Sequence, residues 1–154
     1  MEISNSFDVN SPISQVWAVL TDLERIAPCL PGAELTQSTP EQNHSGIIYE
    51  GVIKVKVGPV SVKYNGTASF TELDEANHRA VLVANGTGAA GAGNASATIT
   101  AHLEALDDSS TRVHVDTDMT ITGKLAQFGR GIMGDISSKM MNQFADNLSQ
   151  VLAD

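Results

Sequence analysis

The chain has 154 residues with a formal net charge of −9, and only 5% of the residues are aromatic. This length predicts one domain, residues 1–154, that buries roughly 70% of the surface of its unfolded chain, with a core of aliphatic and small side chains. The negative charge argues against nucleic acid as a partner and against general adhesion to an anionic membrane. The only cysteine, Cys29, excludes an internal disulfide and suits a reducing cytosol.

The N-terminal part of the chain predicts one strand followed by two short helices. Residues 2–9 alternate between apolar and polar side chains, which is typical of a half-buried strand. Ser11 as the N-cap and Pro12 at the first helical position begin a helix. The apolar face of this helix carries Ile13, Val16, Trp17 and Leu20. Residues 22–31 form a second short helical segment that ends at a proline. The first ten residues, MEISNSFDVN, show no signal peptide.

Six further strands are predicted by runs rich in Val, Ile, Thr and Ala. Their ranges are 33–39, 44–57, 60–73, 78–88, 94–106 and 111–121. If Gly58-Pro59 forms a hairpin turn, apolar residues and glycines share one face of the hairpin, and Gly51 lies opposite Gly66. Two opposing glycines remove side chains from the inner face, so the sheet is expected to bend there.

The same register places three lysines together on the outer face of the hairpin. Lys54 lies opposite Lys63 with Lys56 nearby, and like charges so placed repel slightly. A basic spot on an otherwise acidic protein is a candidate docking surface for a partner. The alternative is an ordinary solvated outer face.

The C-terminal part predicts one long helix, residues 125–152. Its apolar residues recur every three or four positions and form one stripe. The stripe consists of Leu125, Phe128, Ile132, Ile136, Met140, Phe144, Leu148 and Leu152. At 1.5 Å per residue this helix would run about 40 Å, long enough to cross a small domain. Such a helix laid over a curved antiparallel sheet encloses space.

Small side chains dominate the strand that faces this space. Its inward residues include Ala95, Ala97, Ile99 and Ala101, which leave a gap that Leu or Phe would close. Protein interiors normally pack to a density of about 0.75. Either the helix therefore packs tightly on this wall, or a ligand fills the gap. Strand parity and the helix stripe predict a cavity lined by Tyr49, Ile53, Tyr64, Ala68, Phe70, Ala97, Ile99, Met119, Phe128, Ile132, Met133, Ile136 and Met140.

No group of residues predicts a catalytic or metal site. Residues 86–91 and 129–134 match G-x-G-x-x-G, but neither joins a strand to a helix as a dinucleotide site requires. His102 and His114 are expected to be exposed cross-strand neighbours, with metal binding as the alternative. Cys29 could be a nucleophile only with a nearby base, and the sequence indicates none. We therefore expect a protein that is not an enzyme and holds no metal.

The order of the predicted elements is that of the helix-grip fold, an α+β architecture found in START-type lipid carriers and plant pollen allergens (the SRPBCC superfamily). It predicts a curved antiparallel sheet of about seven strands around the long C-terminal helix. Within this fold the chain resembles the carbon monoxide dehydrogenase G-subunit family over nearly its whole length. The resemblance is carried by residues 28–33 (PCLPGA), 56–59 (KVGP), 64–68 (YNGTA), the Gly/Ala stretch from Gly86, and 121–129 (ITGKLAQFG).

The resemblance implies a helper of aerobic, molybdenum-containing carbon monoxide dehydrogenase, with no catalytic residues and no covalent cofactor. Some members carry a further C-terminal tail linked to membrane attachment, which this sequence does not include. Joined to the expected cavity, this context favours a non-catalytic carrier of a lipophilic small molecule. The expected ligand is an isoprenoid quinone, menaquinone or ubiquinone, carried between that enzyme and the membrane.

This hypothesis places the protein in the cytoplasm, at the inner face of the membrane, which it contacts transiently. Two alternatives remain open at this point. The first is a membrane-recruitment or assembly factor without a ligand, and the second is a cyclase- or hydrolase-type enzyme of the same fold.

Overall fold

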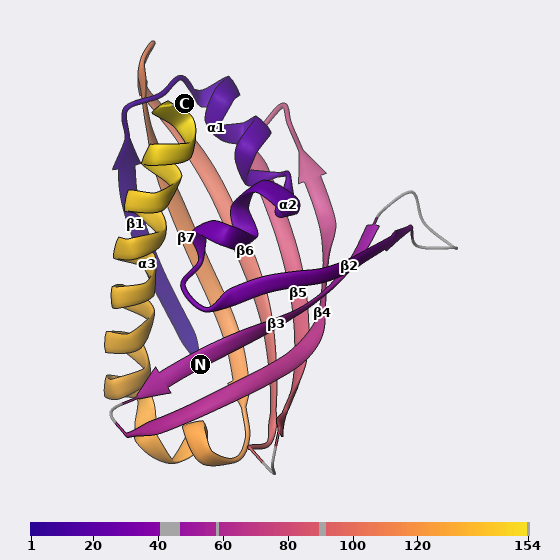
Figure 1. Ribbon diagram of the computed structural model, residues 1–154. Helices are drawn as coiled ribbons and strands as arrows, with labels where there is room; N and C mark the ends of the chain where they lie inside the picture. The colour runs from indigo at the N-terminus through magenta and orange to yellow at the C-terminus, as the bar shows by residue number, and fades with distance from the viewer. Residues whose placement is uncertain (41–46, 58, 90–91, 154) are drawn as a thin grey trace.

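The computed structural model describes residues 1–40, 47–57, 59–89 and 92–153 (Figure 1). The N-terminal elements are β1 (Glu2–Val9), α1 (Ile13–Leu20), α2 (Leu23–Ile26) and the 3-10 helix η1 (Ala27–Cys29). The strands that follow are β2 (Ala33–Pro40), β3 (Ile47–Val57), β4 (Val60–Asp74), β5 (Arg79–Gly88), β6 (Asn94–Asp107) and β7 (Ser110–Ile121). The 3-10 helix η3 (Lys124–Phe128) and the helix α3 (Gly129–Ala153) complete the elements.

The seven strands form one antiparallel sheet in the order β1-β7-β6-β5-β4-β3-β2. The sheet is curved, and α3 lies against its inner face, closest to β1 and η1 (Figure 1). The short helices α1 and α2 lie near the C-terminal end of α3, whereas the end of β3 and the start of β4 lie beside its N-terminal end. The predicted strands are all present, although residues 44–46 lie outside the described part of the chain.

Both helix starts differ from the sequence prediction. Helix α1 begins at Ile13, and Pro12 occupies the N-cap position without a side-chain hydrogen bond. The carbonyl of Ser11 instead accepts a hydrogen bond of 2.8 Å from the hydroxyl of Thr111. The long helix is interrupted at Gly129, whose φ of 80° lies outside the right-handed helical region. Leu125, the first residue of the predicted stripe, therefore lies on η3 and not on α3.

The predicted register of the β3–β4 hairpin is confirmed. Gly51 pairs with Gly66, which in turn pairs with Gly86 of β5. A Cβ atom on Gly66 would collide with the backbone of β5, and one on Gly51 would lie 2.6 Å from the carbonyl oxygen of Glu34 on β2. Neighbouring backbones therefore approach each other where these glycines cross the sheet, and no side chain fits there.

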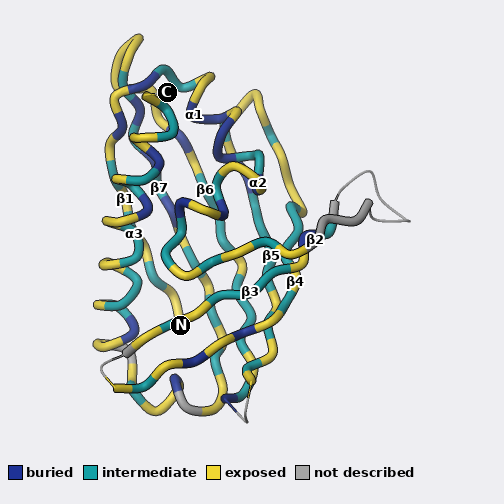
Figure 2. Tube along the Cα trace, in the orientation of Figure 1, coloured by how far each residue is buried: buried dark blue, intermediate teal, exposed yellow. Residues whose placement is uncertain are grey.

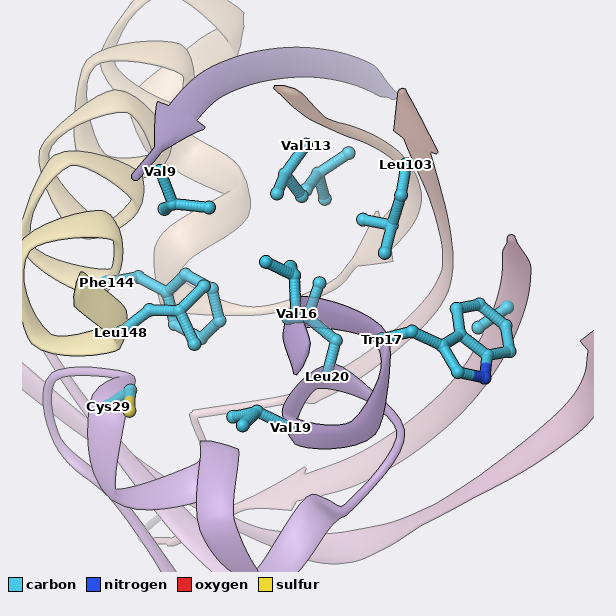
Figure 3. Close-up of a cluster of buried hydrophobic side chains, with 12 residues drawn as sticks. Val9, Val16, Trp17, Val19, Leu20, Cys29, Leu103, Val113, Phe144 and Leu148 are labelled. Atoms are coloured by element: carbon cyan, nitrogen blue, oxygen red, sulfur yellow. The ribbon is translucent and has the colours of Figure 1, made fainter. Parts of the chain in front are cut away.

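The main hydrophobic core joins α1, the C-terminal half of α3 and the adjoining strands (Figure 3). This first cluster contains Val9, Val16, Trp17, Val19, Leu20, Cys29, Ala80, Leu103, Val113, Val115, Phe144 and Leu148, all buried. Phe7 of β1 packs edge-on against Phe144, with ring centroids 6.0 Å apart. Burial alternates along both edge-side strands: β1 alternates between exposed and half-buried residues, and the first half of β7 alternates between half-buried and buried ones (Figure 2). The first cluster thus fixes the position of α3 on the sheet.

Candidate ligand-binding site

A second hydrophobic cluster lies at the N-terminal end of α3, where η3 and the β3–β4 hairpin meet it. Its buried members are Val62, Tyr64, Ala92, Leu125 and Met133. Around them lie Ile53, Val55, Val60, Ala95, Met119, Ile121, Phe128 and Ile136, which are only half-buried. Half-buried members outnumber buried ones here, the reverse of the first cluster. Apolar side chains that stay partly exposed on an inner wall form a surface that a lipophilic ligand can cover.

Two rows of small residues cross the inner face of the sheet beside the second cluster, and we call them the small-residue rows. The first row runs through Gly51, Gly66, Gly86 and Ala95. The second runs through Ala68, Ala84 and Ala97, with Tyr49 at one end and Met119 at the other. Between Tyr49 and Met119 the inner face of the sheet therefore carries no large side chain along these rows.

Tyr64 is the polar residue of the second cluster. Its side chain lies beside Gly86, because a Cβ atom on that glycine would be 3.3 Å from Cβ and 3.8 Å from Cδ1 of Tyr64. The residue is 5% exposed, and its hydroxyl has no hydrogen-bond partner among the described residues. A buried hydroxyl without a partner costs about 1–3 kcal/mol. Burial raises the pKa of Tyr64, so the hydroxyl keeps its proton and remains a donor.

Tyr49 is the second buried tyrosine on the inner face, with 7% of its surface exposed. It pairs with Ala68 in the second small-residue row. Burial is the main cause that raises the pKa of Tyr49, and the negative charges of Asp22 and Glu24 add to it. Tyr49 therefore also remains protonated at neutral pH.

The structure divides the predicted lining residues among several places. Six belong to the second cluster: Ile53, Tyr64, Met119, Phe128, Met133 and Ile136. Two pack against the first cluster, namely Phe70 and Ile99. Tyr49 is buried, and Ala68, Ala97 and Met140 are half-buried. The predicted set thus reaches from the second cluster across the small-residue rows to the edge of the first.

Ile132 differs from the prediction, because it is 43% exposed. At 100° per residue, Ile132 lies about 120° around the helix from Phe144, whereas Met133 lies only about 20° from it. A stripe with a strict spacing of four residues drifts around the helix, so its first member on α3 leaves the inner face. Met133, which is 4% exposed, takes that position.

Several residues of the second cluster were not among the predicted lining residues. Val55 and Val62 share the inward parity of Ile53 and Tyr64, so strand alternation could have identified them. Ala92 follows β5 in a connecting segment, where no periodicity marks which residues face inward.

The three predicted docking lysines lie together on the outer face of the hairpin. Lys54 and Lys63 are directly opposite each other, and both they and Lys56 are exposed. Within the described part of the chain, none of the three forms an ion pair, whereas Arg79 and Arg112 pair with acidic residues. We call these lysines the lysine patch.

His102 and His114 lie on the outer face of the sheet, away from the second cluster. His102 and His114 stack with ring centroids 6.0 Å apart, and His114 also contacts Glu104 at 3.1 Å. Among the described residues, no three side chains of metal-ligand type lie together. Cys29 is buried, its thiol donates to the Arg25 carbonyl at 3.7 Å, and burial raises its pKa, which disfavours the reactive thiolate.

Solved structures identify the fold as the helix-grip fold. A conserved protein from Geobacillus kaustophilus is 19% identical with a TM-score of 0.84, covering 99% of this chain and 95% of that one. The Zhui aromatase/cyclase from Streptomyces sp. R1128 is 13% identical with a TM-score of 0.68, covering 99% and 93%. Norcoclaurine synthase from Thalictrum flavum, in complex with dopamine and hydroxybenzaldehyde, is 16% identical with a TM-score of 0.65, covering 99% and 86%.

The protein therefore has the helix-grip fold, with an apolar inner wall whose side chains are partly exposed. The family model for the carbon monoxide dehydrogenase G-subunit (CoxG) matches residues 6–153, and the chain belongs to that family. No curated protein sequence matches the chain. In the described residues, no helix combines the length and hydrophobicity needed to cross a membrane.

Proposed function

We propose that this protein is a non-catalytic carrier of an isoprenoid quinone, menaquinone or ubiquinone, that serves a molybdenum-containing carbon monoxide dehydrogenase. The observation that carries the proposal is the partly exposed apolar wall of the second cluster, which continues into the small-residue rows. The protein would act in the cytoplasm and contact the inner face of the membrane transiently. Family membership supports the choice of partner enzyme.

The chemistry of the wall suits a prenylated ring. Each buried methylene contributes about 0.8 kcal/mol, so one isoprene unit of five carbons contributes about 4 kcal/mol. Half-buried Met119, Phe128 and Ile136 offer adaptable apolar contacts for such a chain. A ring needs only one or two hydrogen bonds for its orientation, and protonated tyrosine hydroxyls can supply them.

A carrier of this kind answers a physical problem of the enzyme reaction. Electrons released by a soluble enzyme must reach a quinone that is buried in lipid. A protein that shields the quinone in an apolar site can move it between the two phases without exposing its tail to water.

The alternatives are weaker on the same observations. An enzyme of the cyclase or hydrolase type would need acid or base groups in the site, and the wall residues named above include no carboxylate and no imidazole. A recruitment or assembly factor without a ligand would leave the partly exposed wall and the small-residue rows without a role.

The direct test is to extract purified protein with organic solvent and identify the bound molecules by mass spectrometry. Protein produced in a quinone-making host should contain quinone close to one molecule per chain. Delipidated protein should also take up menaquinone from vesicles. If neither experiment yields bound quinone, the carrier proposal is wrong.

The lysine patch is proposed as the docking surface. Reversing Lys54 and Lys63 to Glu should weaken binding to vesicles of anionic lipid, or to the partner enzyme, by at least about 30-fold at low salt, since the loss of two cations that each contribute about 1 kcal/mol removes about 2 kcal/mol. Sedimentation with vesicles containing phosphatidylglycerol measures the effect, which should shrink as salt screens the charges.

Lys139→Glu is the control for this experiment, because Lys139 is exposed on α3 outside the patch. It should leave vesicle binding nearly unchanged. Neither variant should change the unfolding temperature by more than a few degrees, since exposed charges contribute little to stability. If the Lys54/Lys63 variant and the wild type bind equally well at low salt, the lysine patch is an ordinary solvated face and not a docking surface.

A further inference from the structure

The hydroxyl of Tyr64 is the feature of the second cluster that apolar burial does not explain. It is buried and has no hydrogen-bond partner among the described residues. The other buried members of the cluster, Val62, Ala92, Leu125 and Met133, have no polar side-chain atom that could accept its proton apart from a thioether sulfur, a weak acceptor. A strong acceptor for this hydroxyl must therefore come from outside the cluster.

The neighbours of Tyr64 in the second cluster are apolar, and most of them are only half-buried. On β5 Tyr64 pairs with Gly88, whose side-chain space is occupied by Ala92, so that side of the ring is closed. Toward the small-residue rows the tyrosine side chain itself covers Gly86. The half-buried side chains of the second cluster, such as Met119 and Phe128, are the surface beside Tyr64 that a flat group can cover.

We propose that the Tyr64 hydroxyl donates a hydrogen bond to a carbonyl oxygen in the head of the ligand, and so selects oxygen-bearing ring ligands over hydrocarbons of the same shape. The inference rests on the proposed carrier function and specifies how its site recognises the ligand. The head lies against the half-buried side chains of the second cluster, and the tail continues past Ala84 and Ala97.

A hydrogen bond to an oxidised quinone must be donated by the protein. A quinone carbonyl has lone pairs but no proton, so its partner must be a donor. Tyr64 keeps its proton at neutral pH because it is buried, and a protonated phenol supplies one strong donor. Sites that hydrogen-bond a ligand discriminate strongly against analogues that leave the buried group unpaired.

The test compares two probes of similar shape, menadione (2-methyl-1,4-naphthoquinone) and 2-methylnaphthalene, which lacks both carbonyl oxygens. Equilibrium dialysis with delipidated full-length protein measures both affinities. The wild type should bind menadione at least about tenfold more tightly than the hydrocarbon. Tyr64→Phe, which removes only the hydroxyl, should abolish this preference and leave binding of 2-methylnaphthalene equal or tighter.

Thr98→Val is the control, since it removes a hydroxyl from an exposed residue on the outer face of β6, and it should keep the preference for menadione. The unfolding temperature of Tyr64→Phe should equal or exceed that of the wild type, because no hydrogen bond within the protein is lost. A Tyr64→Phe variant that still prefers menadione contradicts the role of Tyr64 and leaves the carrier proposal intact. Failure of the wild type to bind either probe overturns both proposals.

Discussion

Replacing Ala97 with Trp is expected to abolish loading with long-chain quinone while leaving the fold intact. Ala97 lies between Ala84 and Met119 in the second small-residue row, on the path proposed for the tail. An indole at this position would displace about four methylenes of the tail, which lowers affinity by about 100-fold. Uptake of menaquinone from vesicles, followed by extraction and mass spectrometry, measures the loss.

The same variant tests separately where the head of the ligand and its tail bind. Menadione has no tail and should still bind to the Ala97→Trp protein, with Tyr64 as its donor. Thr98→Trp is the matched control, because Thr98 is the next residue on β6 and is exposed on the outer face. It should load quinone like the wild type.

Two outcomes would contradict the predicted path of the tail. If Ala97→Trp still carries menaquinone at the wild-type level, the ligand does not lie on this row. If the variant is strongly destabilised, the row is already densely packed, because overpacking a filled core costs about 1–3 kcal/mol. The unfolding temperature of the delipidated variant distinguishes these cases from the expected one. The electron-transfer assay should agree with the loading assay, since the variant should fail to pass electrons from the enzyme to membrane quinone.

Replacing Leu148 with Ala should cause the largest loss of stability among single substitutions on α3. Leu148 is 0% exposed and lies in the first cluster, which holds α3 against the sheet. Removing a buried leucine side chain costs about 3–4 kcal/mol, from lost hydrophobic transfer and from the cavity that remains. Urea unfolding of delipidated protein should show this decrease, which is a large part of the roughly 5–15 kcal/mol typical of a domain.

Ile136→Ala is the comparison variant on the same helix, about three turns earlier. Ile136 is half-buried in the second cluster, so its truncation should cost only about 1 kcal/mol of stability. It should, however, weaken quinone binding several-fold, which Leu148→Ala should not do in the fraction that remains folded. If both variants lose the same free energy of unfolding, the second cluster is as tightly packed as the first. It then has no partly exposed apolar surface for a ligand to cover.

The strands and the hairpin register were predictable from the sequence because they depend on local alternation. The turn at Gly58-Pro59 and the period of two along both strands together fix which residues oppose each other, so the pairs Gly51–Gly66 and Lys54–Lys63 followed directly. Gly58 itself lies outside the described residues. The small side chain of Ala97 on the inner face was visible in the same way.

The depth and division of the interior were not predictable by the same reasoning. The alternation along a strand predicts the face of the sheet to which a side chain points, but not whether a neighbouring side chain covers it. The sequence therefore could not separate the first cluster from the second. The long helix is interrupted at Gly129 because of the φ angle of that residue, and the spacing of the apolar residues gives no information about this angle. The unpartnered hydroxyl of Tyr64 depends on Ala92 and Leu125, which only the three-dimensional fold brings to it.

The place of β1 at the edge of the sheet has a consequence for how the protein is made. β1 is synthesised before the other strands of the sheet, yet among the described strands it pairs with β7 alone, so that Asp8 pairs with Arg112, 104 residues further along the chain. While the ribosome works through the intervening strands, Phe7 and Val9 have no sheet to cover them. Consecutive strands β2 to β7 can pair with their neighbours as they emerge, since each partner is adjacent in sequence. β1 therefore stays unpaired until β7 has been made, and a chaperone that binds short apolar segments could protect Phe7 and Val9 in the interval.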